Sequence, residues 1–122
     1  MNEKTKYFAG FVKIIDKNDY RSITRCLYYQ VLHTMCDLME LKGWKATGRL
    51  SHTKVRQRFV KMYEISDEIK NKMIDWKKAR ENVDYKRQVS DYLSEDKLRE
   101  HIYAMLSFIK HYSAVLVIGD TQ

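Results

Sequence analysis

The chain has 122 residues, with no proline, only four glycines and a formal net charge of +7 at pH 7. This length predicts a single domain, residues 1–122, that is large enough to enclose a hydrophobic core. Proline and glycine mark most turns, and a chain with so few of them is not expected to be rich in strands. This composition favours long helices joined by short turns. We therefore expect an all-α protein, an antiparallel helical bundle of about four to five helices.

Membrane insertion and secretion are not expected from the sequence. The longest uncharged apolar run, Ala114–Gly119, is too short to cross a bilayer. The N-terminal segment is charged at Glu3, Lys4 and Lys6 and lacks the long apolar stretch of a secretory signal. Cys26 and Cys36 are ten positions apart, roughly 15 Å along one helix, which is too far for a disulfide. These features predict a cytoplasmic protein with two free thiols.

The first two predicted helices come before the glycine at position 43. Apolar spacing predicts a short helix over Lys6–Ile15, after which Asn18 or Asp19 caps a long helix that ends near Leu41. Gly43 is suited to terminate that helix. The apolar residues of the long helix recur at helical spacing and predict a central, nearly encircled element: Ile23, Leu27, Tyr28, Val31, Leu32, Met35, Leu38 and Met39.

A second, more polar stripe on the same helix contains Arg25, Tyr29, His33 and Cys36. It is either the ordinary flank of a core helix or the lining of a polar groove. His33 and Cys36 supply two metal ligands at most, so no metal site is predicted. A flank of this kind needs cover, which favours a homodimer.

Positive charge is concentrated between Lys42 and Tyr63, where no acidic residue occurs. Within this window Ser51 caps a third predicted helix with one apolar side and one basic side. The basic side is Lys54, Arg58 and Lys61. The asymmetry indicates a face for an anionic partner such as RNA or a nucleotide, and the alternative is a solubilising surface.

The fourth predicted helix begins after Ser66 and ends near Asp84 or Tyr85. Its inward stripe combines four apolar residues with Arg80: Ile69, Met73, Trp76 and Val83. A guanidinium in such a stripe is either a structural tie to a neighbouring helix or a functional group in a groove.

The last predicted helix begins after Ser94, and its seam is Leu98, Ile102, Met105, Ile109, Tyr112 and Leu116. Residues from Gly119 onward are expected to fray. No phosphate-binding glycine loop, zinc-protease motif, Cys-x-x-Cys pair or nucleophile elbow is present, so no cofactor is predicted.

Three segments together resemble the HEPN family (higher eukaryotes and prokaryotes nucleotide-binding domain). Residues 19–29 with His33 are similar to its Arg, paired tyrosines and histidine on the second helix. Residues 79–85, Ala-Arg-Glu-Asn-Val-Asp-Tyr, resemble the Ala-Arg-x-x-Ala-Asp-Tyr signature of one branch, with Val83 in place of the second alanine. His52-Thr53-Lys54 resembles the element that opens the family's third helix.

This resemblance implies a homodimeric helical bundle that is often encoded beside a minimal nucleotidyltransferase in a toxin–antitoxin module. Catalytic members are metal-independent RNases that use an arginine followed by four to six residues and a histidine. In this sequence the histidine after Arg80 is missing, which removes a group typically worth about 10²–10⁴-fold in rate. Asp84 and Tyr85 are the candidates to replace it, although neither side chain ordinarily titrates near neutrality.

The sequence thus predicts a HEPN-family protein of a prokaryotic or mobile-element toxin–antitoxin or defence system, without full RNase activity. It would bind RNA, a nucleotide or a partner nucleotidyltransferase. The expected binding residues are Arg25, Tyr29, His33, His52, Lys54, Arg58 and Lys61, with Arg80 at the centre. The alternatives are an RNase with a shifted site and a purely structural interaction protein.

Overall fold

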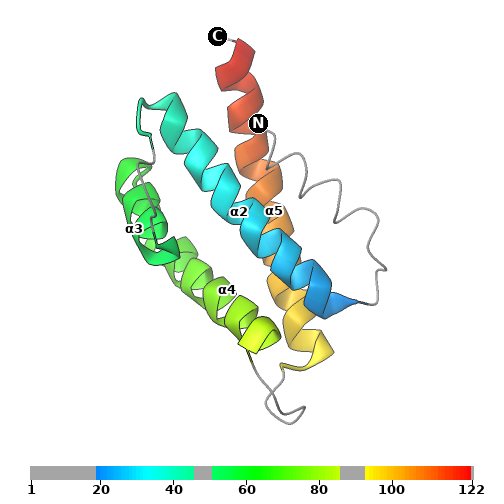
Figure 1. The fold of residues 1–122 in the computed structure, drawn as a ribbon. Coiled ribbons are helices and arrows are strands. Elements are labelled where there is room, and N and C mark those ends of the chain that lie inside the picture. The colour runs from blue at the N-terminus through cyan, green and yellow to red at the C-terminus, as the bar shows by residue number, and fades with distance from the viewer. Residues whose placement is uncertain (1–18, 46–50, 86–92, 122) are drawn as a thin grey trace.

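The computed structural model describes residues 19–45, 51–85 and 93–121 (Figure 1). These residues form four helices and no strand: α2 (Tyr20–Leu41), α3 (His52–Met62), α4 (Asp67–Tyr85) and α5 (Glu95–Thr121). The all-α bundle is therefore confirmed. The short helix predicted over residues 6–15 lies outside the described residues.

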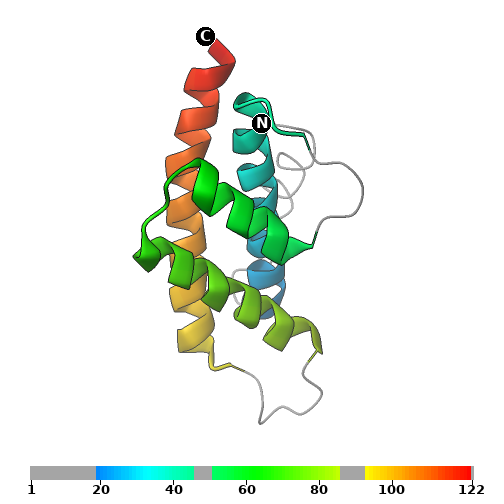
Figure 2. The same cartoon turned by 90° about the vertical axis from the view of Figure 1, so that its left-hand side faces the viewer.

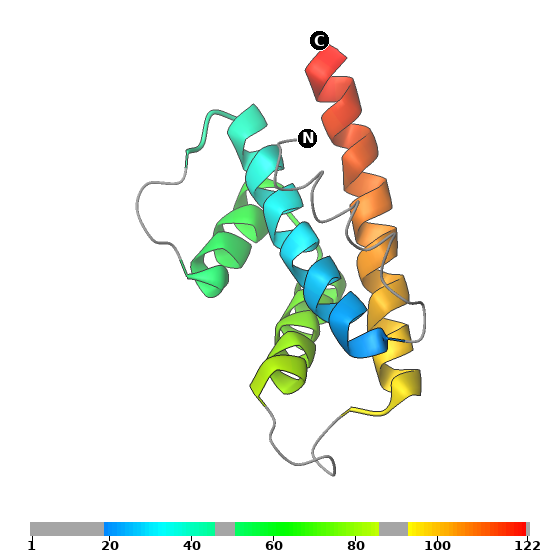
Figure 3. The same cartoon turned by 45° about the vertical axis from the view of Figure 1, so that its right-hand side comes forward.

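The helices form two layers (Figure 2). The two longest helices, α2 and α5, lie side by side and run in the same direction, whereas α4 runs opposite to both (Figures 1 and 3). Helices α3 and α4 cover one side of this pair, and α4 returns the chain to the end of the bundle where α5 begins. The direction of α5 follows from that return path.

The core is built from the predicted stripes of all four helices. Leu27, Leu38 and Met39 of α2 are completely buried, as are Phe59 of α3 and Met105 of α5. Phe108, which the predicted seam of the last helix omitted, is also buried and contacts Phe59 and Trp76 edge to face. Aromatic contacts of this kind stabilise the junction of α3, α4 and α5 beyond simple burial.

Side-chain caps fix where the helices begin. Asp19 accepts a hydrogen bond from the Ser22 amide at 3.1 Å, and Ser51 accepts one from the Lys54 amide at the same distance.

At the other end of the chain, α5 continues through Thr121, so the expected fraying from Gly119 is wrong as far as that residue. A glycine costs a helix only about 1 kcal/mol relative to alanine, and no proline follows to block the last turn.

Cys26 is buried and Cys36 half-buried, and neither forms a disulfide bond, as their spacing predicts. Among the described helices, none has the length and apolar character needed to cross a bilayer.

Candidate functional site

The site is centred on Arg80, a residue of α4 that is only 7% exposed and whose side chain is turned toward α2. Its Nη1 atom donates to the hydroxyl of Tyr85 at 3.1 Å and to the carboxylate of Asp84 at 3.5 Å. Its Nη2 atom lies 3.2 Å from Nδ1 of His52, the first residue of α3. The Nε atom is buried and has no hydrogen-bond partner among the described residues. Arg80 therefore links α4 to the start of α3.

Three tyrosine rings surround the guanidinium of Arg80. Its central carbon lies 5.2 Å from the ring centre of Tyr28, 5.8 Å from that of Tyr29 and 5.6 Å from that of Tyr85. Rings at these distances attract a cation electrostatically. Burial lowers the pKa of Arg80, but the hydrogen bond to Tyr85 and the neighbouring tyrosines outweigh it, so its pKa is raised overall. The guanidinium is thus held charged inside the protein.

His52 contributes a neutral imidazole to this group. Arginine can only donate, so Nδ1 of His52 is the acceptor toward Arg80 and the ring proton is on Nε2. The hydroxyl of Tyr28 lies 3.1 Å from the same nitrogen. Burial lowers the pKa of His52, and the charges of Arg80 and Lys77 lower it further. The imidazole is therefore uncharged at neutral pH.

Asp84 serves two guanidinium groups. Besides Arg80, it forms an ion pair with Arg25 of α2, whose side chain is 48% exposed. One turn earlier on α2, Arg21 donates to the main-chain carbonyl of Val83. Positive charge therefore exceeds negative charge where α2 meets the end of α4. We call Arg25, Tyr28, Tyr29, His52, Arg80, Asp84 and Tyr85 the Arg80 cluster.

The basic side of α3 is solvent-exposed, as predicted. Lys54, Arg58 and Lys61 are exposed and Arg56 is half-exposed. None of the four forms an ion pair with a carboxylate of the described residues. We call these four residues the α3 basic strip. Helix α3 is connected to α4 near its first turn, where Lys77 donates to the hydroxyl of Thr53 at 3.2 Å.

The structure brings together six of the residues selected from the sequence: Arg25, Tyr29, His52, Arg80, Asp84 and Tyr85. His33 is half-buried further along α2, and none of the contacts of Arg80 described above involves it.

Sequence reasoning missed Tyr28 and Lys77 as members or neighbours of this site. Tyr28 fits the apolar stripe of α2 and is indeed buried, so its periodicity concealed its polar role. Its place beside Tyr29 was the available signal. No group of three or more metal-ligating side chains is found in the described parts of the chain.

Comparisons with known proteins do not identify a family. No protein-family model matches the chain, and no significant match is found among the curated proteins or among the solved structures. The likeness to HEPN proteins therefore remains a prediction based on the three sequence segments.

Proposed function

We propose that this protein binds RNA through the Arg80 cluster and the α3 basic strip. The observation that carries the proposal is the charge balance around Asp84, where two guanidinium groups share one carboxylate. A phosphate can take the acceptor positions that Asp84 leaves unfilled.

Two further features support RNA as the anion. The ring of Tyr85 is 68% exposed beside Arg80, so an unpaired base can stack on it. The α3 basic strip extends from the same site, because His52 of the cluster is the first residue of that helix. Lysine and arginine side chains along a helix are suited to follow a phosphate backbone.

Replacing Lys54, Arg58 and Lys61 together by glutamine tests the proposal. We expect affinity for a single-stranded RNA oligonucleotide, measured by fluorescence anisotropy, to fall at least about tenfold near 0.1 M salt. The slope of log affinity against log salt should fall by about 2, since each lost phosphate contact removes about 0.7.

A matched control is Lys72, Arg99 and Lys110 replaced by glutamine, which removes the same number of lysines and arginines from exposed positions on α4 and α5. Its RNA affinity should stay close to that of the original protein. An equal loss of RNA affinity in both triple variants, or no loss in the first, would show that the α3 basic strip only makes the surface soluble.

The biological setting that we propose is a toxin–antitoxin or defence system of the HEPN type, with a minimal nucleotidyltransferase as partner. Co-purification followed by mass spectrometry of bound proteins and nucleic acid tests this setting. Recovery of neither RNA nor a nucleotidyltransferase from the native host would contradict it.

A second candidate function, metal-independent RNA cleavage, is favoured by the contact between His52 and Arg80. His52 of α3 lies beside Arg80, so it can supply the imidazole that the sequence lacks after Arg80. When a phosphate draws Arg80 away and the 2′-hydroxyl takes the place of the Tyr28 hydroxyl, Nδ1 of His52 can act as its base. That oxygen then attacks phosphorus, the 5′-oxygen leaves and takes a proton from water, and a 2′,3′-cyclic phosphate results.

Cleavage of a labelled RNA in the presence of EDTA tests this second candidate. Both His52→Ala and Arg80→Ala should abolish cleavage. An RNA that stays intact with the original protein, while binding is retained, would leave RNA binding as the function.

A further inference from the structure

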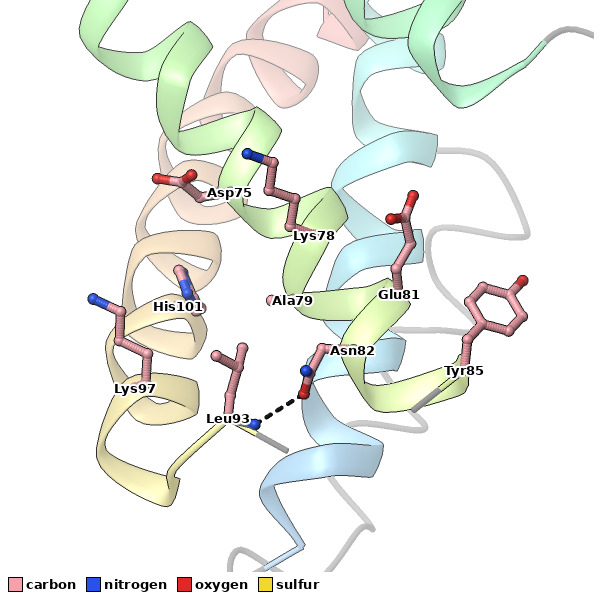
Figure 4. Close-up of a pocket in the computed structure, with 9 residues that line it drawn as sticks. All are labelled: Asp75, Lys78, Ala79, Glu81, Asn82, Tyr85, Leu93, Lys97 and His101. Carbon is pink, nitrogen blue, oxygen red and sulfur yellow. Dashed lines mark hydrogen bonds between the residues drawn. The ribbon is translucent and has the colours of Figure 1, made fainter. Parts of the chain in front are cut away.

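A pocket of about 260 Å³ lies between the first half of α4 and the middle of α5. It is distinct from a larger cleft of about 650 Å³ between the second half of α4 and the first half of α5 (Figure 4). The larger cleft is lined by the carboxylates of Asp75 and Glu81 as well as the ammonium groups of Lys78 and Lys97, so its charges nearly cancel. The smaller pocket combines aromatic rings with an ammonium group, and none of the described residues that line it is acidic.

The inner wall of the smaller pocket is apolar and aromatic. Trp76 of α4 and Phe108 of α5 are 3% and 6% exposed, and their rings meet edge to face with centres 5.7 Å apart. Tyr112, one turn after Phe108, is half-buried, and its ring centre lies 4.6 Å from that of Phe108. Ile69 and Ala104 complete this wall. Because the core holds these side chains in place, they offer another ring a preformed surface on which to pack.

The rim of the pocket carries hydrogen-bond donors from both helices. Lys72 of α4 has Glu68 at 3.6 Å, but the two side chains are 51% and 80% exposed, so this pair is weak and leaves the ammonium group available. Ser107 and His111, both exposed, line the pocket from α5. A hydroxyl and an imidazole N–H each donate hydrogen bonds. The rim therefore suits a carboxylate and disfavours a cation.

The volume of the pocket limits the size of its ligand. An apolar cavity of about 150 Å³ accommodates benzene, whereas drug-sized ligands usually occupy about 300–1,000 Å³. At about 260 Å³, this pocket has room for one ring, or a fused pair of rings, with a short side chain.

We propose that this pocket binds a small aromatic carboxylic acid. The ring packs against Trp76 and Phe108, and the carboxylate lies at the rim, where Lys72 binds it and Ser107 or His111 supplies a second donor. The site does not depend on the proposed function, because none of its lining residues belongs to the Arg80 cluster or the α3 basic strip.

Phenylacetate titrated into the ¹⁵N-labelled full chain tests the proposal by NMR. The chain has two tryptophans, of which Trp76 lines the pocket and Trp44 does not, and the Trp44→Phe variant assigns their indole N–H signals. We expect a saturable shift of the Trp76 signal with a Kd of about 1 mM or lower, and little change in the Trp44 signal. Phenylacetamide, which has the same ring and no charge, should bind about threefold more weakly.

Two matched pairs of variants locate the two parts of the ligand. Lys72→Gln should weaken phenylacetate binding about threefold and leave phenylacetamide binding unchanged, whereas Lys110→Gln, at an exposed lysine outside the pocket, should change neither. Ala104→Leu should fill part of the pocket and weaken the binding of both ligands at least about tenfold. Ala114→Leu, which adds the same side chain at an exposed position of α5, should not.

Three results would overturn the proposal. The first is the absence of a saturable Trp76 shift with phenylacetate, and the second is equal affinity for phenylacetate and phenylacetamide. The third is phenylacetate binding that is unchanged in a folded Ala104→Leu variant, because the ligand would then lie elsewhere. The triple variant of Lys72, Arg99 and Lys110 should weaken phenylacetate binding as Lys72→Gln does and still bind RNA, so this proposal and the proposed function can each fail alone.

Discussion

At the scale of single residues, Arg80 is buried, yet its polar partners do not depend on it. Asp84 retains the ion pair with Arg25, and His52 retains the hydroxyl of Tyr28. Tyr85 is exposed, so water can replace the guanidinium at its hydroxyl. Within the described parts of the chain, removing Arg80 therefore leaves no charged group buried and unpaired, and it also removes an Nε atom that has no hydrogen-bond partner there.

We predict that Arg80→Ala lowers the free energy of unfolding by only about 1–2 kcal/mol, from lost ring contacts and packing. Breaking a buried ion pair that leaves a charge behind costs about 3–5 kcal/mol. RNA binding per folded molecule should be lost. Arg80→Lys should be almost as defective, because an ammonium group lacks the planar fork that reaches two acceptors at once.

Thermal melts measured beside RNA binding decide between a functional and a structural arginine. A large fall in Tm with binding intact per folded molecule would make Arg80 a structural tie between helices.

His52 predicts a pH dependence of stability. Its pKa is lowered in the folded protein, so the unfolded chain takes up a proton near pH 6.5 that the folded chain does not. The contribution of His52 is thus fully present above pH 6.5 and is lost as the pH falls toward the lowered folded pKa. His52→Gln should show a smaller fall in Tm between pH 8 and about pH 5.5.

The matched control for this measurement is His111→Gln, which removes an exposed histidine of α5. His101 also has a lowered pKa, so it changes stability with pH in the same direction as His52, and this contribution persists in both variants. A pH profile of His52→Gln that coincides with that of the original protein would contradict the protonation state assigned to His52.

At the scale of the helices, the end of α2 depends on one glycine. The amide of Gly43 donates to the carbonyl of Glu40 at 3.0 Å, and the amide of Trp44 donates to that of Met39 at 3.1 Å. This paired arrangement requires a left-handed residue, and Gly43 has φ of 87°. It satisfies carbonyl groups that the end of a helix otherwise leaves open.

Gly43→Ala should lower the free energy of unfolding by about 1 kcal/mol, because an L-residue is strained in this conformation. A Cβ atom at this position would have no neighbour within 4 Å, so no steric clash adds to the cost. Gly43→Asn, which tolerates the left-handed region better, should lose less. Chemical denaturation measures both, and equal stability of the alanine variant would show that the turn relaxes.

The helices themselves could be predicted from the sequence because their signals are local. Asp19, Ser51 and Gly43 mark helix ends through contacts with residues at most four positions away. The stripe of α4 also placed Arg80 correctly toward α2. The burial of Phe108 was not predicted, because a seam of alternating three- and four-residue steps does not include this position.

The assembly of the site could not be predicted, because it depends on how the helices cross. His52 and Arg80 are 28 positions apart, and Arg25 and Asp84 are 59 apart. Their contacts follow from the placement of the start of α3 beside the end of α4, which no spacing along the chain encodes. For the same reason, the absence of a histidine after Arg80 did not reveal that His52 lies beside it.

At the scale of the whole molecule, the basic part and the acidic part of the chain are on different helices. The α3 basic strip contains only cations, whereas from Asp91 onward the chain has more acids than bases. An anionic ligand such as RNA is therefore directed toward α3 and away from α5. One face of α5 therefore remains available for contacts that do not involve an anionic ligand.

We predict that the protein is a homodimer that uses this face of α5. The flank from which a dimer was expected, Tyr29, His33 and Cys36, is already half-buried within one chain. Tyr103 and Leu106, one turn apart on α5, are 64% and 41% exposed, so they form an apolar surface that a second copy of the chain can cover. Sedimentation velocity at tens of micromolar should show a dimer, and Tyr103→Glu with Leu106→Glu should give a monomer.

Leu41→Glu, at a comparably exposed leucine on α2, should remain dimeric. A monomeric original protein would contradict the prediction, and a dimeric double variant would move the interface away from α5.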